Sequence, residues 1–534
     1  MRPPSTITSR RPRLRLSGIR LAALGLGIAF LAAGCAGPLR FPSASLAEKE
    51  TRAGLVQAYD TNGDKRADYF TTQGPDGRID RIAYDTTGDG AADSFVNLDD
   101  IPFADCRHIV FVLDGFPYDL VKAFRDKGRL RLFYPPARVI STYPAMTDLA
   151  LAEVFVSPKP LGFESLYYDH RANRLVGGNG DYLSLKNEAW ARLVDYRAGS
   201  LLDPISYIYP NYAFDRELED FARLLARRDR RHVIGYFVST AGLATRFGAA
   251  GIEKALDAVD RLAHQLVAES RGLVKITVLA DHGHTLKRCE RIDFHKFLRD
   301  KGWRVTDRLN GPRDVAPVEF GLITYASFAA HDRPALAADL LEHEGVRFTI
   351  YQEGGAVVIR ARDGEFRIER RGDRYRYRAS APSSGDPSTM LRVALSKSKG
   401  DPLQLAAILE RLKADGKMDA DGFVADRDLF LATAEHRYPD PLDRIWRAFT
   451  GMVENVPDVI ADLAAGYYAG AATRAAWFDS AASTHGDLEH MSSTTFVMST
   501  AGPLTGPLRS REVPQALERL TGESWPPPRE KTGK

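Results

Sequence analysis

Short apolar runs alternate with amphipathic stretches along most of the chain after residue 104. HIVFVL, HVIGYFV and VKITVLA, at residues 108–113, 232–238 and 274–280, are short, β-branched and apolar on both faces. Such runs are typical of strands buried in a parallel sheet. Residues 215–229 and 251–270 instead carry apolar side chains at helical spacing. Strands that alternate with helices predict an α/β fold, with a mostly parallel central sheet and helices on both faces.

The pattern changes between residues 322 and 430. Residues 356–379 read AVVIRARDGEFRIERRGDRYRYRA, with period-two alternation and a D-G turn, which predicts hairpin strands. We therefore expect a β-rich cap at 322–430, inserted between two parts of the α/β core at 104–321 and 431–512. The tail at 513–534 ends in WPPPREKTGK and is predicted to be disordered.

A repeat precedes the α/β region and predicts a small module at residues 55–100. AYDTNGDKRADYF at 58–70 and AYDTTGDGAADSF at 83–95 match in spacing, and the turn GPDGR lies between them. Both segments place oxygen-bearing side chains at alternate positions, as a hard Ca²⁺ ion requires. The pattern resembles the start of an EF-hand or dockerin loop, but Thr71 and Val96 stand where the bidentate Glu belongs; a pair of Asx turns is the alternative. The predicted calcium ligands are Asp60, Asn62, Asp64, Asp68, Asp85, Asp89 and Asp93.

The N-terminus has the features of a bacterial lipoprotein signal peptide. A basic segment precedes the apolar stretch LAALGLGIAFLA, which is short for a membrane span. The sequence LAAGC follows and resembles a lipobox with Cys35 as the lipidated residue. We therefore expect residues 1–35 to be a signal peptide, residues 36–54 a tether, and the protein to be lipid-anchored in the cell envelope. Ala36 favours the outer membrane where the cell has one.

Composition limits the possible functions. An apolar share of 44% and a charged share of 27% are those of a globular protein. The formal net charge is +3, but residues 1–35 contribute six arginines and no acid, so the rest of the chain carries −3. That balance does not suggest a nucleic-acid binder, and no nucleic-acid partner is expected. Cys106 and Cys289 are too few for a disulfide scaffold and are predicted to be free thiols.

Chemically active side chains follow the predicted strands. Asp114 ends one strand, and Asp281 and His282 end another. In open α/β sheets the carboxyl ends of the strands are where ligands bind. Carboxylate and imidazole groups are ligands for a divalent transition metal: Zn²⁺ is favoured, with Mn²⁺ or Fe as alternatives. Further candidates are Thr142 and Thr147 in STYPAMTDLA, His284 in ADHGH, and His485, Asp487 and His490 in STHGDLEH.

The ordered set VLDGF, YPAMT, ADHGH and THGDLEH resembles the alkaline phosphatase superfamily, and most closely the type I phosphodiesterase and nucleotide pyrophosphatase group. The resemblance spans about residues 104–320 and 430–510. It implies that Asp114, Asp281 and His282 bind one metal and that His485 binds a second. It also implies that Thr147 is the nucleophile that becomes phosphorylated, with Thr142 as the alternative. The implied substrate is a phosphate ester.

The chain departs from this family at the second metal site. The family motif supplies an Asp and a His there, whereas YFVSTAGLATRFG places Ala241 and Thr245 at those positions. Neither side chain replaces a carboxylate or an imidazole. Three interpretations remain: a one-metal enzyme helped by Arg246; a rebuilt site that uses His284, His485, His490 or Asp487; or a catalytically inactive binding protein.

The leading prediction is therefore an envelope-anchored, metal-dependent phosphodiesterase or phosphatase. A lipid-anchored ligand-binding protein on the same scaffold is the alternative. Transfer of a phosphate-linked head group to an envelope glycan is a third reading, which the lack of a transmembrane bundle disfavours. The predicted partners are a phosphate-ester substrate and, through the lipid anchor, a membrane. The sequence does not indicate the oligomeric state.

Overall fold

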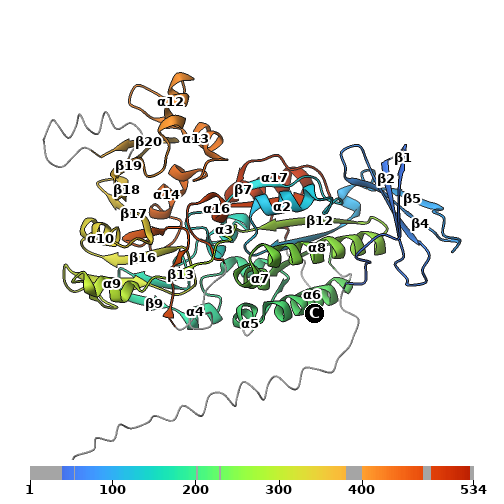
Figure 1. Cartoon of the computed structure of the whole chain (residues 1–534), viewed down its shortest axis with the longest axis horizontal. Helices are drawn as coiled ribbons and strands as arrows, with labels where there is room; N and C mark the ends of the chain where they lie inside the picture. Colours follow the sequence, from blue (N-terminus) through green and yellow to red (C-terminus); the bar gives the residue numbers. More distant parts are fainter. Residues whose placement is uncertain are drawn as a thin grey trace, which may run out of the picture.

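The computed structural model describes residues 39–52, 54–199, 202–227, 230–380, 400–472 and 483–528. Three sheets follow one another along the long axis of the molecule (Figure 1). A five-stranded sheet lies at one end, a seven-stranded sheet in the middle and a nine-stranded sheet at the other end. The predicted signal peptide, including Cys35, lies outside the described residues. Within the described ranges, no helix has the length and apolar character needed to cross a membrane.

The seven-stranded central sheet confirms the predicted fold class. Its strand order is β10-β11-β6-β12-β24-β7-β25. Neighbouring strands are parallel except on both sides of β24. The strands are β6 (Arg107–Leu113), β7 (Ala137–Ile140), β10 (Tyr196–Arg197), β11 (His232–Phe237), β12 (Val274–Ala280), β24 (Thr494–Ser499) and β25 (Leu508–Arg509).

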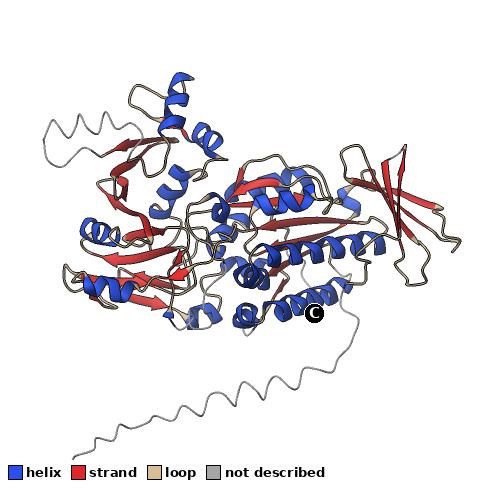
Figure 2. Ribbon diagram, in the orientation of Figure 1, coloured by secondary structure: helices blue, strands red, loops and turns tan. Residues whose placement is uncertain are grey.

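Helices cover both faces of this sheet (Figure 2). On one face Phe111 of β6 packs in a cluster with α2, α6, α7 and α8. On the other face Val112 packs with α3 and α17. Because successive strand residues point to opposite faces, a strand buried on both sides is apolar throughout. These helices are α2 (Tyr118–Asp126), α3 (Thr147–Val154), α6 (Pro210–Ala226), α7 (Ser239–Phe247), α8 (Ala249–Glu269) and α17 (Val513–Thr521); α5 (Leu202–Ile208) precedes α6.

The second large sheet is wider than the predicted cap. Its order is β14-β15-β16-β22-β17-β18-β19-β20-β21, so it recruits strands from both sides of residues 322–430. The sheet thus extends beyond the predicted cap boundaries, because β14, β15 and β22 lie outside them. The strands are β14 (Arg304–Val305), β15 (Asp314–Val318), β16 (Tyr325–Ala330), β17 (Val346–Glu353), β18 (Ala356–Ala361), β19 (Gly364–Arg371), β20 (Arg374–Ala379), β21 (Val424–Ala425) and β22 (Val459–Leu463).

Shorter elements complete the two large layers. Helices associated with the nine-stranded sheet are α9 (Phe294–Asp300), α10 (Arg333–Leu340), α12 (Ala406–Ala414), α13 (Asp426–Thr433) and α14 (Pro441–Phe449). Among the described residues, the remaining α-helices are α4 (Asn179–Leu183) and α16 (His490–Ser493), and the 3₁₀ turns are η1 (Phe103–Asp105), η2 (Ala189–Leu193) and η3 (Ser510–Glu512). Two small pairings join β8 (Leu166–Asp169) to β9 (Arg174–Gly177), and β13 (Glu290–Arg291) to β23 (Tyr467–Tyr468).

The repeat forms a five-stranded antiparallel sheet of successive hairpins. Its strands are β1 (Ala47–Thr51), β2 (Gly54–Tyr59), β3 (Tyr69–Gln73), β4 (Ile79–Tyr84) and β5 (Ser94–Asn97). The module packs beside the amino ends of the central strands, where Lys275 Nζ donates to the carbonyl of Leu98 (2.7 Å). The carboxyl ends of these strands, at Leu113 and Ala280, lie away from this module.

Two predicted irregular segments contain ordered structure. Within the predicted tether, β1 pairs along β2; all five of its side chains are exposed, so hydropathy gave no sign of the backbone pairing. Within the predicted disordered tail, α17 buries Leu517, and the buried Trp525 donates from Nε1 to the carbonyl of Val154 (2.7 Å). The polar residues after Trp525 hid this amphipathic helix from a composition argument. Cys106 and Cys289 are buried and free, as predicted.

Candidate metal centre

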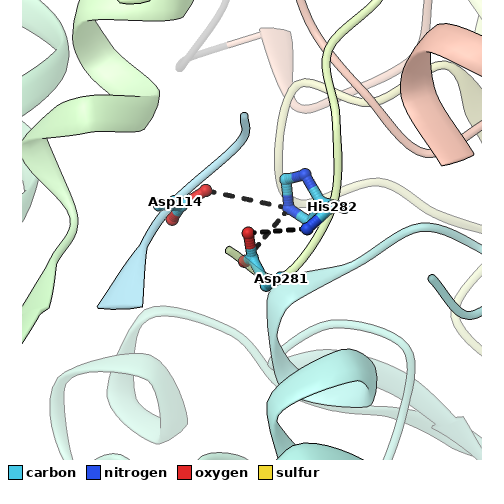
Figure 3. Close-up of side chains that lie close together, drawn as sticks. All are labelled: Asp114, Asp281 and His282. Carbon is cyan, nitrogen blue, oxygen red and sulfur yellow. Dashed lines mark hydrogen bonds and ion pairs between the residues drawn. The ribbon is translucent and has the colours of Figure 1, made fainter. Parts of the chain in front are cut away.

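Two carboxylates emerge side by side at the carboxyl edge of the central sheet. β6 and β12 are parallel neighbours, and their last residues, Leu113 and Ala280, are paired. The next residues along the two strands are Asp114 and Asp281, which are 3% and 1% exposed. Parallel pairing thus brings together two groups that are far apart in the sequence. His282 completes the cluster from the residue after Asp281 (Figure 3).

The three side chains converge on one point. Ligand atoms of Asp114, Asp281 and His282 all lie within 4.8 Å of one another. His282 Nε2 is 3.3 Å from Asp281 Oδ2 and 3.7 Å from Asp114 Oδ1. In the described part of the chain, no other group of three or more His, Cys, Asp or Glu residues meets this criterion. Two carboxylates and one imidazole form a donor set suited to a divalent transition metal.

The hydrogen bonding of His282 leaves its Nε2 atom available to bind a metal. Nδ1 lies 2.9 Å from the carbonyl of Gly283, and because a carbonyl only accepts, Nδ1 carries the proton. Nε2 therefore presents a lone pair toward the two carboxylates. Burial lowers the pKa of His282 to about 4, so the ring is neutral at pH 7. A neutral imidazole with its second nitrogen anchored is the form that binds metals.

Asp281 supplies the test of whether the pocket fits a cation. Its Oδ1 accepts from the backbone N–H of Gly115 (3.0 Å) and of His282 (2.8 Å). Its Oδ2 is buried without a hydrogen-bond partner. Burial also raises the pKa of Asp281. A buried carboxylate oxygen that lacks a donor is unfavourable, and a metal ion at this point would compensate it. The residues present therefore fit a bound divalent cation.

Two glycines allow the strand ends to approach this closely. Gly115 has φ +80°, and a Cβ atom there would lie 2.5 Å from Cδ2 of His284. A Cβ atom at Gly283 would lie 1.9 Å from the carbonyl oxygen of Met491. A side chain at Gly115 would push against the ring of His284, and one at Gly283 would push against the backbone of α16. The D-G and D-H-G motifs are thus a packing requirement of the cluster.

Thr147 lies beside the cluster. It is the first residue of α3, and its Oγ1 is 3.3 Å from His282 Nε2. The hydroxyl also acts to lower the pKa of the nearby Asp281 carboxyl group, against the larger effect of burial, which raises it. Thr142 is placed differently: it is buried and its Oγ1 donates to the carbonyl of Pro144 (2.9 Å). Only the hydroxyl of Thr147 is directed at the predicted ligands.

His485 lies against the cluster without joining the three-residue group. Its ring stacks on His282 with centroids 3.9 Å apart and an interplanar angle of 18°. Nδ1 lies 2.8 Å from the carbonyl of Ala145 and therefore donates to it, which leaves Nε2 as an acceptor. Burial lowers the pKa of His485 to about 3. A neutral His485 is available beside the cluster, but no shared ligand point with Asp114 and Asp281 is formed.

The substitute ligands suggested by the sequence separate into two groups. His284 is fully buried, its ring centroid is 5.3 Å from that of His485, and its Nε2 has no hydrogen-bond partner. His490 instead points away and pairs with Asp119 (3.2 Å). Asp487 accepts from the backbone N–H of Glu489 (2.9 Å), and burial raises its pKa to about 7. Neither His490 nor Asp487 belongs to the ligand cluster.

The structure also locates the residues that depart from the family motif. Ala241 and Thr245 both lie on α7 and are buried. Thr245 lines the same cavity as Asp114, Thr147 and His485. Arg246, the next residue, is exposed and is not among the residues that line this cavity. Thr245 therefore faces the cavity beside the cluster, whereas Arg246, which the sequence suggested as a substitute for the second metal, does not line this cavity.

Sequence reasoning missed the side chains that hold Asp114. Tyr236 on β11 donates its hydroxyl to Asp114 Oδ2 (2.5 Å). The ring of Trp190 meets Tyr236 edge-on at 4.9 Å, and its Nε1 donates to Asp148 Oδ1 (3.1 Å). Tyr236 and Trp190 thus form a chain of contacts from Asp114 to Asp148, the residue that follows Thr147. Tyr236 is the first residue of YFVSTAGLATRFG, the segment that departs from the family motif. Its position in that segment was the one feature of the sequence that could have pointed to a role near the ligands.

The acidic loops of the N-terminal module use their carboxylates locally. Asp60 accepts from the backbone N–H groups of Gly63 (2.6 Å) and Lys65 (2.8 Å). In the second loop Asp85 accepts from those of Gly88 and Gly90. These are Asx-type turns, the alternative that the sequence left open. The other predicted ligands also accept local bonds: Asn62, Asp64, Asp68, Asp89 and Asp93. Calcium binding stays a prediction.

No protein-family model matches the chain, and no curated protein matches its sequence. Among solved structures, a phosphonoacetate hydrolase from Sinorhizobium meliloti in complex with phosphonoformate is 13% identical, with a TM-score of 0.40, and the match covers 82% of this chain and 99% of that one. Murine ectonucleotide pyrophosphatase/phosphodiesterase 5 is 10% identical, with a TM-score of 0.39, and the match covers 79% of this chain and 97% of that one. Similarity at these TM-scores supports no conclusion about the fold or activity of this chain.

Proposed function

We propose that this protein is a metal-dependent phosphoric ester hydrolase, held at the cell envelope by a lipid on Cys35. One observation carries the proposal: the hydroxyl of Thr147 lies 3.3 Å from His282 Nε2, in a cluster where three ligand groups meet within 4.8 Å. A hydroxyl nucleophile beside a divalent cation is the arrangement that phosphoryl transfer uses. The motif resemblance assigns the same roles to the same residues.

Asp114, Asp281 and His282 would hold the metal, which supplies a positive charge that stabilises both the Thr147 alkoxide and the oxygens of the phosphoryl group. Thr147 Oγ would give up its proton and attack phosphorus in line; the P–O bond to the leaving group would break, and the departing alkoxide would take up a proton, so that the hydroxyl proton of Thr147 is balanced by the one on the alcohol released. Water then attacks the phosphothreonine, which regenerates the Thr147 hydroxyl and releases phosphate or a phosphate monoester. Tyr236 keeps Asp114 Oδ2 occupied, so Oδ1 faces the cluster.

Metal content and turnover test the proposal together. The purified protein should contain about one tightly bound transition metal per chain and should hydrolyse p-nitrophenyl phosphate or its bis ester. Ala241→Asp with Thr245→His restores the family motif on α7 and should raise the metal content toward two. Two tightly bound metals in the unmodified protein would contradict the one-metal view and would implicate His284 beside His485.

A second candidate function, ligand binding without hydrolysis, is favoured by Ala241 and Thr245. Ala241 and Thr245 leave a methyl group and a hydroxyl group where the family motif has a carboxylate and an imidazole. A protein with one metal could then bind a phosphate ester without hydrolysing it. Metal present at one per chain, with no turnover of mono- or diesters before or after the double substitution, would establish this binding function in place of the hydrolase.

A further inference from the structure

Two adjoining cavities lie away from the metal centre. The first, with a volume of about 240 Å³, is formed by β19, α14 and η3. The second, with a volume of about 500 Å³, lies against α3, α17 and the buried Trp525. The two cavities share part of their walls, including Arg447 and Arg511, and neither shares a lining residue with the cavity beside Thr147. They therefore form one site in two parts, separate from the metal centre.

Three guanidinium groups line the first cavity, which we call the arginine cavity. They belong to Arg370, Arg447 and Arg511, and Asp443 is the single carboxylate among the described lining residues. Arg511 Nη1 donates to Asp443 Oδ2 (2.6 Å), and the hydroxyl of Tyr375 donates to Asp443 Oδ1 (3.0 Å). Both oxygens of Asp443 are therefore engaged, and its charge is offset by that of Arg511.

The other two arginines of this cavity keep donors available. Arg447 uses Nη2 for an ion pair with Glu153 of α3, and a guanidinium group has further N–H donors. Arg370 donates from Nε to the carbonyl of Gly372 (2.8 Å), and no carboxylate among the described residues pairs with it. The arginine cavity thus has one unmatched positive charge, which favours a monoanion. A carboxylate is the monoanion whose two oxygens match a guanidinium fork.

The second cavity, which we call the apolar cavity, offers hydrocarbon and aromatic surface in a volume typical of ligand sites. Of its remaining charged residues, Lys159 lies 3.7 Å from Glu454. Glu518 accepts from the backbone N–H of Trp525 (3.1 Å) and stands about two helical turns beyond Arg511. A negative group is therefore drawn to the arginines rather than to this end. The apolar lining residues include Leu149, Ala152, Val156, Met452, Pro514 and Trp525.

Val156 has an unfavourable conformation for its residue type. It follows the end of α3 with φ +51°, in the left-handed region that helix ends usually assign to Gly or Asn. The residue is 67% exposed, so burial within the protein does not compensate the strain. Val156 lines the apolar cavity. A hydrocarbon chain bound there would cover this side chain and supply the missing burial.

We infer that the two cavities together bind a fatty carboxylate. Its head group lies among the three arginines, and its hydrocarbon chain lies in the apolar cavity against α3 and Trp525. Charge complementarity selects the head group, and the exposed side chain of Val156 accounts for the chain. The inference goes beyond the proposed hydrolase and does not depend on it, because no residue of the two cavities belongs to the metal centre.

Binding can be measured with decanoate as the probe and two control ligands. 1-Decanol has the chain without the charge, and acetate has the charge without the chain. Calorimetry on the full-length protein, below the concentration at which decanoate forms micelles, should give at least about tenfold tighter binding of decanoate than of either control. Equal affinity for 1-decanol would exclude a role for the arginines, and equal affinity for acetate would leave a simple anion site. Either result would overturn the inference.

A matched pair of variants on β19 locates the head group. Arg370→Gln removes the unmatched charge and should weaken decanoate binding about tenfold. Arg371→Gln makes the same change at the next residue, which pairs with Asp419 and Asp421 and lines neither cavity, and it should leave binding unchanged. Both arginines are exposed, so neither substitution disturbs the core. Loss in both variants, or in neither, would contradict the assignment.

A variant at the strained position separates binding of the chain from protein stability. Val156→Asn suits the left-handed conformation, so thermal unfolding without ligand should occur at the same or a higher temperature. The variant should bind decanoate several-fold more weakly and acetate unchanged, because only the hydrocarbon chain loses a contact. Undiminished decanoate binding would place the chain outside the apolar cavity and overturn the inference. Hydrolysis of p-nitrophenyl phosphate by the unmodified protein tests the proposed function separately, so the two can fail independently.

Discussion

The centre at the carboxyl edge and the acidic loops at the other end of the molecule are both rich in Asp, yet they use it in opposite ways. In the loops, Asp60 and Asp85 each accept two or more local hydrogen bonds through both oxygens. At the centre, Asp281 keeps Oδ2 buried without a hydrogen-bond partner. The two regions therefore differ in how many carboxylate lone pairs remain available to a metal ion, rather than in the number of carboxylates.

The two regions also differ in whether their carboxylates are positioned by residues nearby in the sequence or by tertiary contacts. Each loop is closed by residues within a few positions of one another, so its carboxylates stabilise a turn by themselves. The centre requires β6 to pair with β12 and α3 to start beside both strands. Tertiary structure can hold a carboxylate oxygen away from every donor, whereas a flexible exposed loop relaxes until its oxygens find one. A strong metal site is therefore expected at the centre.

The largest expected effect is on catalysis. Thr147→Ala removes the hydroxyl that lies among the ligand atoms and should lower turnover of an aryl phosphate by about 10³-fold or more, as expected for loss of a nucleophile. Thr142→Ala is the control, because its hydroxyl only donates to the carbonyl of Pro144. Steady-state kinetics with metal content measured on the same samples checks the pair. Retained turnover in the first variant would exclude Thr147 as the nucleophile.

The next effect tests the comparison itself. Asp281→Asn should weaken the binding of a transition metal by more than about 100-fold, because it removes the charge of a buried ligand. Asp85→Asn makes the same substitution in a loop and should leave that binding unchanged. Competition with a chromogenic chelator measures both affinities. An equal loss in the two variants would show that the metal does not reside at the sheet edge.

The sequence predicted the central sheet well and the surrounding elements less well. β6, β11 and β12 are apolar on both faces, so hydropathy alone revealed them, and parallel pairing then required Asp114 and Asp281 to meet. The extent of the second sheet was underestimated because β14 is only two residues long and β22 is separated from its neighbours by more than a hundred residues of chain. Pairing at that distance leaves no periodic signal in the sequence.

In the candidate site, too, the residues with a local sequence signal were predicted and those placed by tertiary packing were not. Motifs located Thr147, Asp114, Asp281 and His282, because each follows a strand or a turn of recognisable form. Tyr236 and Trp190 were missed, since a buried aromatic side chain reads as core whether or not its polar atom contacts a ligand residue. His490 was suggested by spacing alone, and its pairing with Asp119 depends on how α16 packs against α2. No local pattern carries that information.

A smaller effect concerns the support of Asp114. Tyr236→Phe deletes the hydroxyl that donates to Asp114 Oδ2 and should weaken metal binding by about tenfold, the lower end for residues that orient a ligand. Tyr325→Phe is a comparable control, because this tyrosine is also fully buried but lies on β16. Metal titration followed by tryptophan fluorescence measures the affinity. An unchanged affinity in Tyr236→Phe would show that the 2.5 Å hydrogen bond does not help to hold the ligand.

The smallest expected effect is at the loops. If their carboxylates mainly close turns, calcium binds only weakly, with a dissociation constant of about 10⁻⁴–10⁻³ M, the range of extracellular calcium modules. Asp64→Asn with Asp89→Asn should then abolish the calorimetric signal, because each of these residues has one carboxylate oxygen bonded to a loop amide and one left over as a ligand. The same double variant should not change transition-metal content. Micromolar calcium affinity would contradict the comparison, since it would show that an exposed loop of this kind can release its carboxylates from the backbone and assemble a strong site without tertiary support.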